Sequence, residues 1–413
     1  MRNRVVITGM GVVSSLGDSP RALHASLCAG SSGIRPVELF RTAEFGCPLG
    51  GEIPAFDATK YLGRRNLRPL DRTSRLVASA AQLTLEDSGW TAEMRSAEEL
   101  GLVLGTMFGS LHTISEFDRR ALAAGPAYAS PMDFSNTVIN AAAGQTAILH
   151  NLRGINSTIS TGTTSGLQAI SYATDIIRSG RARAILAGGA DELCFESFCA
   201  FDRAGFLCRS DNSVGDFPIP FDARRNGAAL GEGAALLMLE DAAFARERGA
   251  RVLAQVTGHG NSYDYSRGEE EGEAVSAIAL AVRHALNDAF TLPHEIDCLS
   301  ASANGSYIAD RHEAQGVVIG LNGQACKLPV TAIKSMLGET LGASGAMQVI
   351  ALLGTMRDGV LPGIRQLQQV EDHFPLTLAN SDNQNVDVQT GLINSICFDG
   401  HCCSVVLARC AEN

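Results

Sequence analysis

The sequence predicts an α/β protein with mainly buried sheets. Short apolar, β-branched runs alternate with helix-length segments, the alternation recurs in both halves of the chain, and 43 glycines indicate many tight turns and close backbone approaches. With 413 residues and 45% hydrophobic content, the chain is too long for one ordinary core. Two domains or a duplicated unit are therefore expected.

The first half opens with a buried strand and a glycine-rich loop at 4–17. A helix follows at 17–30, where Asp18 or Ser19 can cap its start and Pro20 suits its first turn. The remaining elements are an amphipathic helix at 74–90, a strand and turn at 99–110, a strand ending in an acidic pair at 181–193, and two strands joined through glycines at 227–241.

The second half repeats the alternation. Its elements are a strand and loop at 251–264, a long helix at 273–289, a strand and loop at 296–306, a short strand, loop and helix at 329–359, and a closing strand, turn and strand at 391–409. No linker stands out between the halves. We therefore predict two halves, 1–250 and 251–413, that share one core.

Composition excludes several classes of protein. A net charge of -11 argues against generic nucleic-acid binding and against attraction to an anionic membrane surface. No apolar run reaches about 20 residues, so no membrane span is expected. The N-terminal apolar run is broken by Gly9 and Gly11, which argues against a signal peptide, and the segment 9–17 lacks the third glycine of a dinucleotide fingerprint. Eleven scattered cysteines without a CxxC pair indicate reduced thiols in a cytoplasmic protein.

The segment NSTISTGTTSGLQAI at 156–170 raises the question of function. An apolar run ends in a tight turn of small hydroxyl residues, and a helix then opens. Such a turn is a common place for a nucleophile, because free backbone N–H groups and the helix dipole favour developing negative charge. The turn holds no cysteine and offers only hydroxyls, at Thr161, Thr163, Thr164 and Ser165.

Four segments in order then identify a resemblance: STGTTSG at 160–166, PFDARRNGAALGEGAALLMLED at 220–241, KSMLGETLGASGA at 334–346 and NSICFDGHCC at 394–403. Together with the N-terminal segment, they resemble the β-ketoacyl-acyl carrier protein synthase II family of condensing enzymes over essentially the whole chain. The resemblance implies a thiolase fold, in which a βαβαβαββ unit is duplicated in five αβαβα layers, and a dimer.

The catalytic residues that the resemblance implies are largely absent. The position of the family's nucleophilic cysteine holds Thr163, and that of its second histidine holds Glu339. The first histidine's position falls on Ser302, or on Asn304 if a short gap is allowed. The family's lysine is present as Lys334. Four residues around Phe398 depart from the family's glycine-rich turn: Cys397, Asp399, His401 and Cys402.

These replacements predict loss of chain-elongation activity. A threonine hydroxyl is a very weak nucleophile without an adjacent base. An anionic Glu339 would repel an enolate, and we expect it to form a buried ion pair with Lys334 instead. The chain therefore resembles a chain length factor, a non-catalytic partner that forms a heterodimer with an active ketosynthase and shapes its polyketide tunnel. Thr163 fits the partners of aryl polyene and related polyene ketosynthases better than the aromatic type II systems, which carry glutamine there.

Two other functions remain open. The chain could be a divergent malonyl-carrier decarboxylase or acyltransferase that uses Thr163, Ser302 or a displaced cysteine. It could also be a homodimeric acyl-binding scaffold. For the chain length factor no cofactor is expected, and its expected partners are the active ketosynthase and, transiently, an acyl carrier protein.

The resemblance also implies two surfaces. Met107, Phe108, Phe134 and Phe398 are candidates for the acyl tunnel and its gate, although core packing explains the first three equally well. Arg64, Arg65 and Arg68 lie in a run of five arginines, completed by Arg72 and Arg75, which could steer an acidic carrier protein.

The remaining polar residues favour structural roles. His401, Cys402 and Cys403 are adjacent and cannot all point to one metal, so no metal site is expected. His312 lies on a predicted helix beside acidic residues and is expected at the surface. Asp191, Glu192 and Glu232 are expected to hold buried turns and backbone amides.

Overall fold

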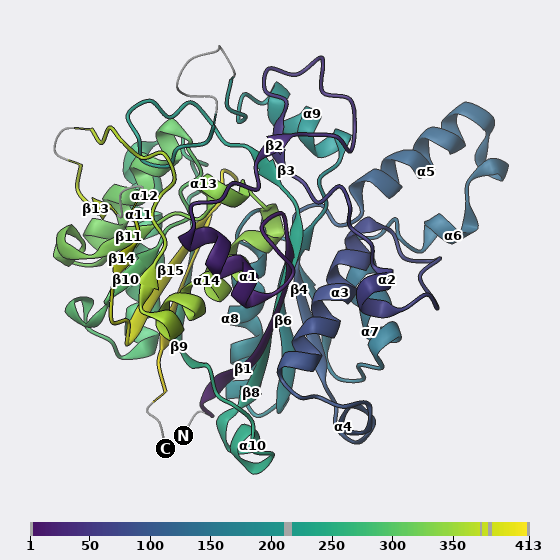
Figure 1. Ribbon diagram of the computed structural model, residues 1–413, viewed down its shortest axis with the longest axis horizontal. Coiled ribbons are helices and arrows are strands. Elements are labelled where there is room, and N and C mark those ends of the chain that lie inside the picture. The colour runs from purple at the N-terminus through teal and green to yellow at the C-terminus, as the bar shows by residue number, and fades with distance from the viewer. Residues whose placement is uncertain (1–2, 210–216, 372–373, 379–381, 411–413) are drawn as a thin grey trace.

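The structure, a computed structural model, describes residues 3–209, 217–371, 374–378 and 382–410. Its first half follows one βαβαβαββ path (Figure 1). The elements are β1 (Val5–Ser14), α3 (Arg72–Asp87), β4 (Gly101–Gly105), α7 (Ala141–His150), β5 (Asn156–Ile159), α8 (Ser165–Arg178), β6 (Ala184–Asp191) and β8 (Gly233–Asp241).

The second half repeats this path. Its elements are β9 (Ala254–Tyr263), α11 (Glu271–Ala289), β10 (Cys298–Ser300), α12 (Tyr307–Gly320), β11 (Pro329–Thr331), α14 (Ser344–Asp358), β15 (Thr390–Ile396) and β16 (His401–Ala408). The short elements that decorate both halves are α1 (Pro20–Cys28), β2 (Arg35–Pro36), β3 (Leu49–Gly51), α2 (Thr59–Leu62), α4 (Ala92–Ala97), α5 (Leu111–Ala124), α6 (Pro131–Phe134), α9 (Phe195–Arg203), β7 (Leu230–Gly231), α10 (Ala242–Glu247), α13 (Lys334–Leu337), β12 (Val360–Leu361), β13 (Thr377–Leu378) and β14 (Gln384–Asn385).

The strand order confirms the duplication. One eleven-stranded sheet runs β13-β11-β10-β15-β16-β9-β1-β8-β6-β4-β5. Within it, β5-β4-β6-β8-β1 and β11-β10-β15-β16-β9 are the same sequence of parallel and antiparallel neighbours in two halves. The halves meet where β1 pairs antiparallel with β9, with Val5 opposite Val256.

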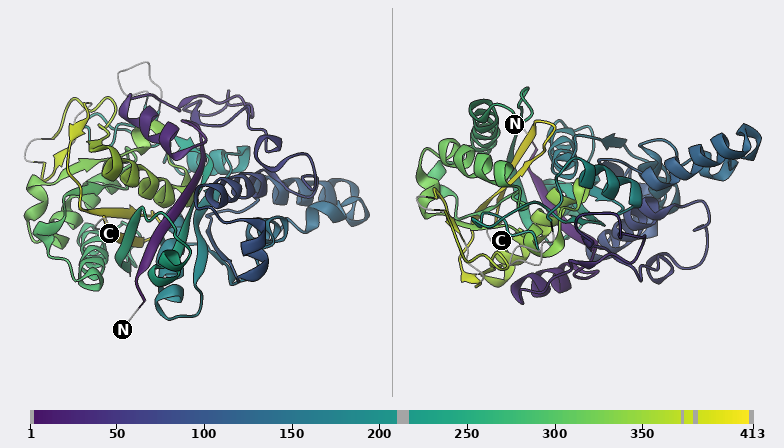
Figure 2. Two further views of the ribbon diagram at one scale, coloured as in Figure 1. Left: turned by 60° about the horizontal axis from the view of Figure 1, so that its bottom comes forward. Right: turned by 90° about the horizontal axis from the view of Figure 1, so that it is seen from above.

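The helices form three layers around the two half-sheets, which gives the five layers expected of the thiolase fold. One outer core joins α3 and α7 to the first half-sheet, and the other joins α11 and α12 to the second. Between them, α8 and α14 pack together in a core that contains residues of both halves. The outer helices lie at opposite sides of the molecule in Figure 1, and Figure 2 shows the same ribbon from two further directions.

The glycines near the N-terminus correct one local prediction. Gly9 and Gly11 were expected in a loop after the first strand, but β1 runs through both. They are needed because α3 crosses the strand closely: a Cβ on Gly11 would lie 2.4 Å from the Ala80 carbonyl oxygen. The expected first helix is present as α1, whose N-cap Ser19 accepts a hydrogen bond from the Ala22 N–H.

Two expected absences can be examined in the described part of the chain. The described helices include none that is long and apolar enough to cross a membrane. Of the eleven cysteines, ten have described side chains and none of these ten forms a disulfide, while Cys326 lies outside the described side chains.

Candidate functional site

The hydroxyl-rich turn connects β5 to the start of α8 and is braced from within. Gly162 adopts a left-handed conformation, with φ of 60°, that lets the chain reverse. The Ser165 hydroxyl donates to the Gly162 carbonyl at 2.6 Å and accepts from the Thr161 N–H at 2.9 Å. The Thr164 hydroxyl donates to the Thr161 carbonyl at 2.6 Å. The small hydroxyl residues therefore hold the shape of the turn.

Thr163 is buried at the tip of this turn, with 3% exposure. Its hydroxyl donates to the Ile396 carbonyl at 2.8 Å, and its backbone N–H donates to the Cys397 sulfur at 3.4 Å. A hydroxyl whose proton goes to a backbone carbonyl has no base to activate it. The turn thus presents a bound threonine and not a prepared nucleophile.

Ser302 reaches the same backbone segment from the loop after β10. Its hydroxyl oxygen accepts from the Ile396 N–H at 3.0 Å and from the Lys334 ammonium at 3.2 Å. Its own N–H donates to the Glu313 carboxylate at 2.7 Å. Ser302 and Thr163 therefore both contact the backbone of Ile396. Ser302, the ungapped position of the family's first histidine, lines the pocket.

Lys334 and Glu339 form the expected ion pair. The ammonium and carboxylate are 2.7 Å apart, and each side chain is 3% exposed. The Glu339 carboxylate also accepts from the Asn304 amide at 3.1 Å and from the Ser344 hydroxyl at 2.5 Å. Both candidates for the first histidine's position, Ser302 and Asn304, thus hydrogen-bond within this network.

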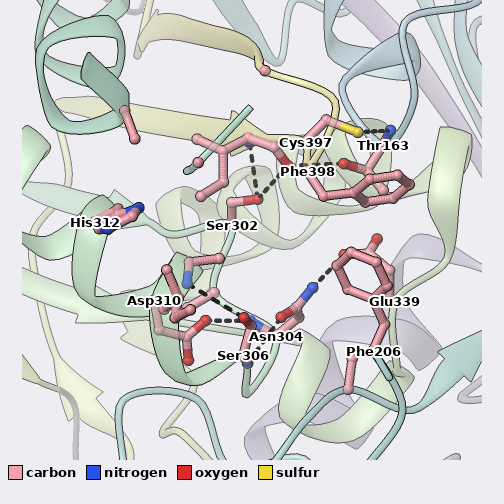
Figure 3. A pocket seen from close by; sticks show the side chains of 18 of the residues that line it. Thr163, Phe206, Ser302, Asn304, Ser306, Asp310, His312, Glu339, Cys397 and Phe398 are labelled. Carbon is pink, nitrogen blue, oxygen red and sulfur yellow. Dashed lines mark hydrogen bonds between the residues drawn. The ribbon is translucent and has the colours of Figure 1, made fainter. Parts of the chain in front are cut away.

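These residues surround one pocket of about 260 Å³ (Figure 3). The positions named from the sequence meet here, since Thr163, Ser302, Asn304 and Glu339 all line it. Lys334 lies behind the wall that Ser302 and Glu339 form. The other lining groups of note are the aromatic rings of Phe201, Phe206 and Phe398, the polar groups of Asp264, Arg267, Ser306 and His312, and the thiols of Cys397 and Cys402.

The four candidate tunnel residues occupy three different places. Phe398 lines the pocket, 40% exposed, with its ring 4.7 Å from that of Phe206. Phe108 lies behind this wall, with its ring 6.2 Å from that of Phe201, and Met107 packs in the same cluster. Phe134 is elsewhere: it lies on α6, 65% exposed, against Phe117.

The acidic residues of the scaffold hold backbone amides, as expected. Asp191 accepts hydrogen bonds from the N–H groups of Met107, Phe108 and Gly342, and burial raises its pKa to about 6. Glu232 accepts from the Ile53 N–H and from the Arg72 guanidinium. Glu192 accepts from the His112 N–H at 3.1 Å, while burial raises its pKa to about 8.

His312 was expected at the surface, and this prediction is wrong. The side chain is 8% exposed and lines the pocket, because α12 packs against α11 and turns this face inward. Burial lowers the pKa of its imidazole, although Glu271 and Asp264 oppose the shift. Flanking acidic residues indicated a solvated face, but Asp310 and Glu313 beside it are themselves buried.

Asp310 and Glu313 are site residues that the sequence patterns missed. Asp310 shapes the loop that carries Asn304 by accepting from the N–H groups of Asn304 and Gly305. Glu313 accepts from the Ser302 N–H and the Asn394 amide, and burial raises its pKa to about 7. An acidic pair three residues apart on a helix gave no signal of burial, because the donors lie in the loop before α12 and on β15 and the contacts depend on how these pack.

The cluster at 401–403 divides between two faces of β16. Cys402 belongs to the outer core and Cys403 to the central core, as expected of adjacent residues in a strand. His401 contacts Asp399 at 3.0 Å and the Tyr263 ring. Within the described residues no group of His, Cys, Asp and Glu is arranged to hold a metal ion.

The arginine run also divides. Arg64, Arg65 and Arg68 are exposed in the segment between α2 and α3. The Arg72 guanidinium is instead held inside the protein: it forms an ion pair with Glu232 at 2.6 Å and donates to the Ile53 carbonyl. Arg75 donates to the Leu67 carbonyl at 3.3 Å.

Comparison with known proteins agrees with this fold. Models of the β-ketoacyl synthase N-terminal and C-terminal domains match residues 2–245 and 253–368. The chain therefore belongs to the β-ketoacyl synthase family.

Among curated relatives, 3-oxoacyl-[acyl-carrier-protein] synthase 2 of Vibrio harveyi is 30% identical over 413 residues, with 100% of both chains covered. The protein of the same name from Vibrio cholerae is 31% identical, with 99% of each chain covered. Among solved structures, a chain of the ishigamide ketosynthase/chain length factor matches with a TM-score of 0.92 and 30% identity over 100% of both chains.

Proposed function

We propose that this chain is a non-catalytic chain length factor, which pairs with an active ketosynthase and shapes the acyl tunnel of a type II polyketide system of the aryl polyene or a related polyene type. The observation that carries the proposal is the buried Lys334–Glu339 ion pair, which occupies the pocket where a condensing enzyme needs a donor to a developing enolate. The likeness to the ishigamide ketosynthase/chain length factor supports it.

The electrostatics of the pocket argue against elongation. A carboxylate beside a developing enolate raises the energy of the transition state, whereas catalysis requires preorganised donors. The Glu339 carboxylate lines the pocket and accepts a hydrogen bond from the Asn304 amide (Figure 3). Behind the pocket wall it also accepts from the Lys334 ammonium. With the Thr163 hydroxyl bound to a carbonyl, no prepared nucleophile remains at this position.

The edge of the sheet supports a partner subunit. β5 is the terminal strand of the sheet, paired on one side with β4. Around it the arm formed by α5 and α6 projects from the body, visible at the right of Figure 1. In the isolated chain this region exposes large apolar side chains to water: Leu122, Tyr128, Phe134, Val138, Ile139, Ile148 and Tyr172. A ketosynthase of the same fold would cover both the edge and the apolar arm.

The tunnel and docking roles follow from this arrangement. Phe134 lies on the arm that faces the proposed partner, and Met107 and Phe108 lie between the arm and the pocket wall. We propose that these residues shape the tunnel from this subunit's side and that Phe398 closes its mouth. Arg64, Arg65 and Arg68 would attract the acidic acyl carrier protein, and the heterodimer would work in the cytoplasm.

Co-expression with an active ketosynthase from the same organism tests the proposal. Size-exclusion chromatography with mass determination should show a stable one-to-one heterodimer, and a Phe108→Ala complex should release longer products than the wild type. Leu292→Ala, at a position 57% exposed in the second half of the chain and away from the arm, is the control for product length. If the chain forms a homodimer and does not bind the ketosynthase, the result would contradict the proposal and favour an acyl-binding scaffold.

A second function has one observation in its favour. The Ser302 hydroxyl lies 3.2 Å from the Lys334 ammonium, the pairing that some Ser–Lys hydrolases use. A divergent malonyl-carrier decarboxylase or acyltransferase could use it if the lysine were neutral. In the structure Lys334 Nζ instead donates to the Glu339 carboxylate at 2.7 Å, which engages it as a donor and not as a base. Release of CO₂ from malonyl-carrier by the isolated chain, abolished by Ser302→Ala, would establish this alternative.

A further inference from the structure

Cys397 lies directly over the hydroxyl-rich turn, although the two segments are 234 residues apart in the sequence. The thiol belongs to the tight turn between β15 and β16, and its sulfur accepts the backbone N–H of Thr163 at 3.4 Å. This contact is drawn in Figure 3, where the sulfur lies between the turn and the pocket. Both residues line the pocket.

We propose that the Cys397 sulfur, by accepting the Thr163 N–H, occupies the backbone donor that the carbonyl oxygen of a thioester would need at this position. The site would then resist acylation even when a nucleophile is supplied at position 163. The inference rests on the proposed non-catalytic function and names a residue that enforces it. It concerns acyl thioesters, the substrate class that carries its leaving group on sulfur.

The donor matters because of its place at the start of α8. Thr163 directly precedes Thr164, the N-cap of α8, so its N–H lies next to the positive end of the helix dipole, where a donor stabilises an oxyanion on an adjacent carbonyl. Removal of one such donor costs an enzyme about 100-fold or more in rate. A sulfur that already accepts the N–H must be displaced before a carbonyl oxygen can take its place, which costs part of this stabilisation.

The sulfur is fixed in this place by its own turn and by Gly162. The Cys397 N–H donates to the His401 carbonyl at 2.9 Å, and the Gly400 N–H donates back to the Cys397 carbonyl at 3.0 Å. On the other side, a Cβ on Gly162 would lie 2.2 Å from the sulfur, so the thiol packs flush against the nucleophile turn. No rearrangement of the turn is needed to make the contact.

The thiol itself is a poor replacement for the lost nucleophile. Burial raises the pKa of Cys397 to about 12, and the neighbouring Asp399 carboxylate acts in the same direction. Because the thiolate is the reactive form, a thiol of this pKa is almost entirely unreactive at neutral pH. Cys397 therefore acts on the backbone of position 163 and does not substitute for its side chain.

The test supplies a thiol at position 163 and then removes the sulfur that covers its N–H. In T163C, the new thiolate attacks the carbonyl carbon of hexanoyl-N-acetylcysteamine. A C–S bond to the protein forms, the bond to the cysteamine sulfur breaks, and the released thiolate takes up the proton. The tryptic peptide 154–178 contains no native cysteine, so acylation at position 163 is measured by mass there alone.

Three variants are compared: T163C, T163C/C397A and T163C/C397S. The alanine removes the acceptor, whereas the serine hydroxyl keeps an acceptor for the same N–H. We expect T163C/C397A to acylate about tenfold faster than T163C, and T163C/C397S to remain within about threefold of T163C. Alkylation by iodoacetamide, which forms no oxyanion, should change less than about threefold in all three. Equal melting temperatures show that the variants are folded.

Acylation of T163C that is unaffected by C397A would overturn the inference, as would an increase in acylation matched by an equal increase in alkylation, since that result indicates simple access. Either result leaves the proposed function intact, because partner binding by the wild-type chain does not depend on it. Conversely, failure to pair with a ketosynthase would sink the proposed function without altering the acylation rates.

Discussion

The Lys334–Glu339 pair gives the sharpest test of how the pocket is held together. In the single variant Glu339→Met, the Lys334 ammonium stays buried with the Ser302 hydroxyl as its remaining close acceptor. In Lys334→Met, the Glu339 carboxylate keeps the Asn304 and Ser344 donors but loses its counter-charge. The double variant K334M/E339M removes both charges and keeps similar volume. Each protein is compared with the wild type.

The expected magnitudes follow from burial. Both side chains are 3% exposed, so an unpaired charge cannot be solvated from outside, and breaking such a pair costs about 3–5 kcal/mol. Replacing both partners by apolar groups is often neutral, so the double variant should be more stable than either single variant. For a cooperative unit of this length, about 4 kcal/mol corresponds to roughly 5 °C in melting temperature.

The assay can use the single tryptophan of the chain. Trp90 is 3% exposed, and its indole N–H donates to Glu240 at 2.8 Å, so unfolding changes its environment completely. Thermal melts followed by its fluorescence should rank the double variant above both single variants. Additive losses in the double variant, or a single variant that melts with the wild type, would refute the idea that the pair is a coupled, desolvated unit.

Three further predictions follow from the described contacts. Gly162→Ala should destabilise the chain by about 2 kcal/mol or more, since it combines a φ of 60° with a 2.2 Å clash, and C397G should recover part of the loss in thermal melts. Burial raises the pKa of Glu313 from 4.5 to about 7. The protonated side chain therefore contributes stability that is fully present below pH 4.5 and is lost as pH rises through 7. Between pH 4 and 9 the free energy of unfolding of the wild type should fall by about 3 kcal/mol more than that of Glu313→Gln, as measured by denaturant titration. Ile148→Asp, at a position 79% exposed, should leave the melting temperature of the isolated chain unchanged but weaken ketosynthase binding at least tenfold by calorimetry.

The fold was predictable because its signals are local. Alternating apolar runs and helix-length segments indicate strands and helices without any knowledge of their neighbours, and the family motifs then supplied the duplicated topology. The error at Gly9 and Gly11 shows the limit of this reasoning. Two glycines in an apolar run indicate a loop equally well, and only the close approach of α3 explains why the strand itself requires them.

The site was predictable in position but not in its contacts. Motif register placed Thr163, Ser302 and Glu339, and the structure brings all three to one pocket. The contact between Cys397 and Thr163 joins opposite halves of the chain, and nothing in either segment indicates it. The predicted surface position of His312 was wrong for a related reason, because the burial of this side chain depends on how α12 packs against α11 and not on its charged neighbours.

The pattern of hydrogen bonds supports the view that the pocket retains its shape for structural purposes. A condensing site must leave donors unsatisfied until the substrate arrives, which costs stability. Here the equivalent groups are directed inward: the Thr163 hydroxyl to Ile396, its N–H to Cys397, and the Asn304 amide to Glu339. Each of these groups makes a hydrogen bond within the protein that stabilises the fold, whereas in a condensing enzyme the equivalent group would be left free to bind the substrate. A subunit whose partner performs the chemistry gains stability from this exchange, and an enzyme would lose its activity by it.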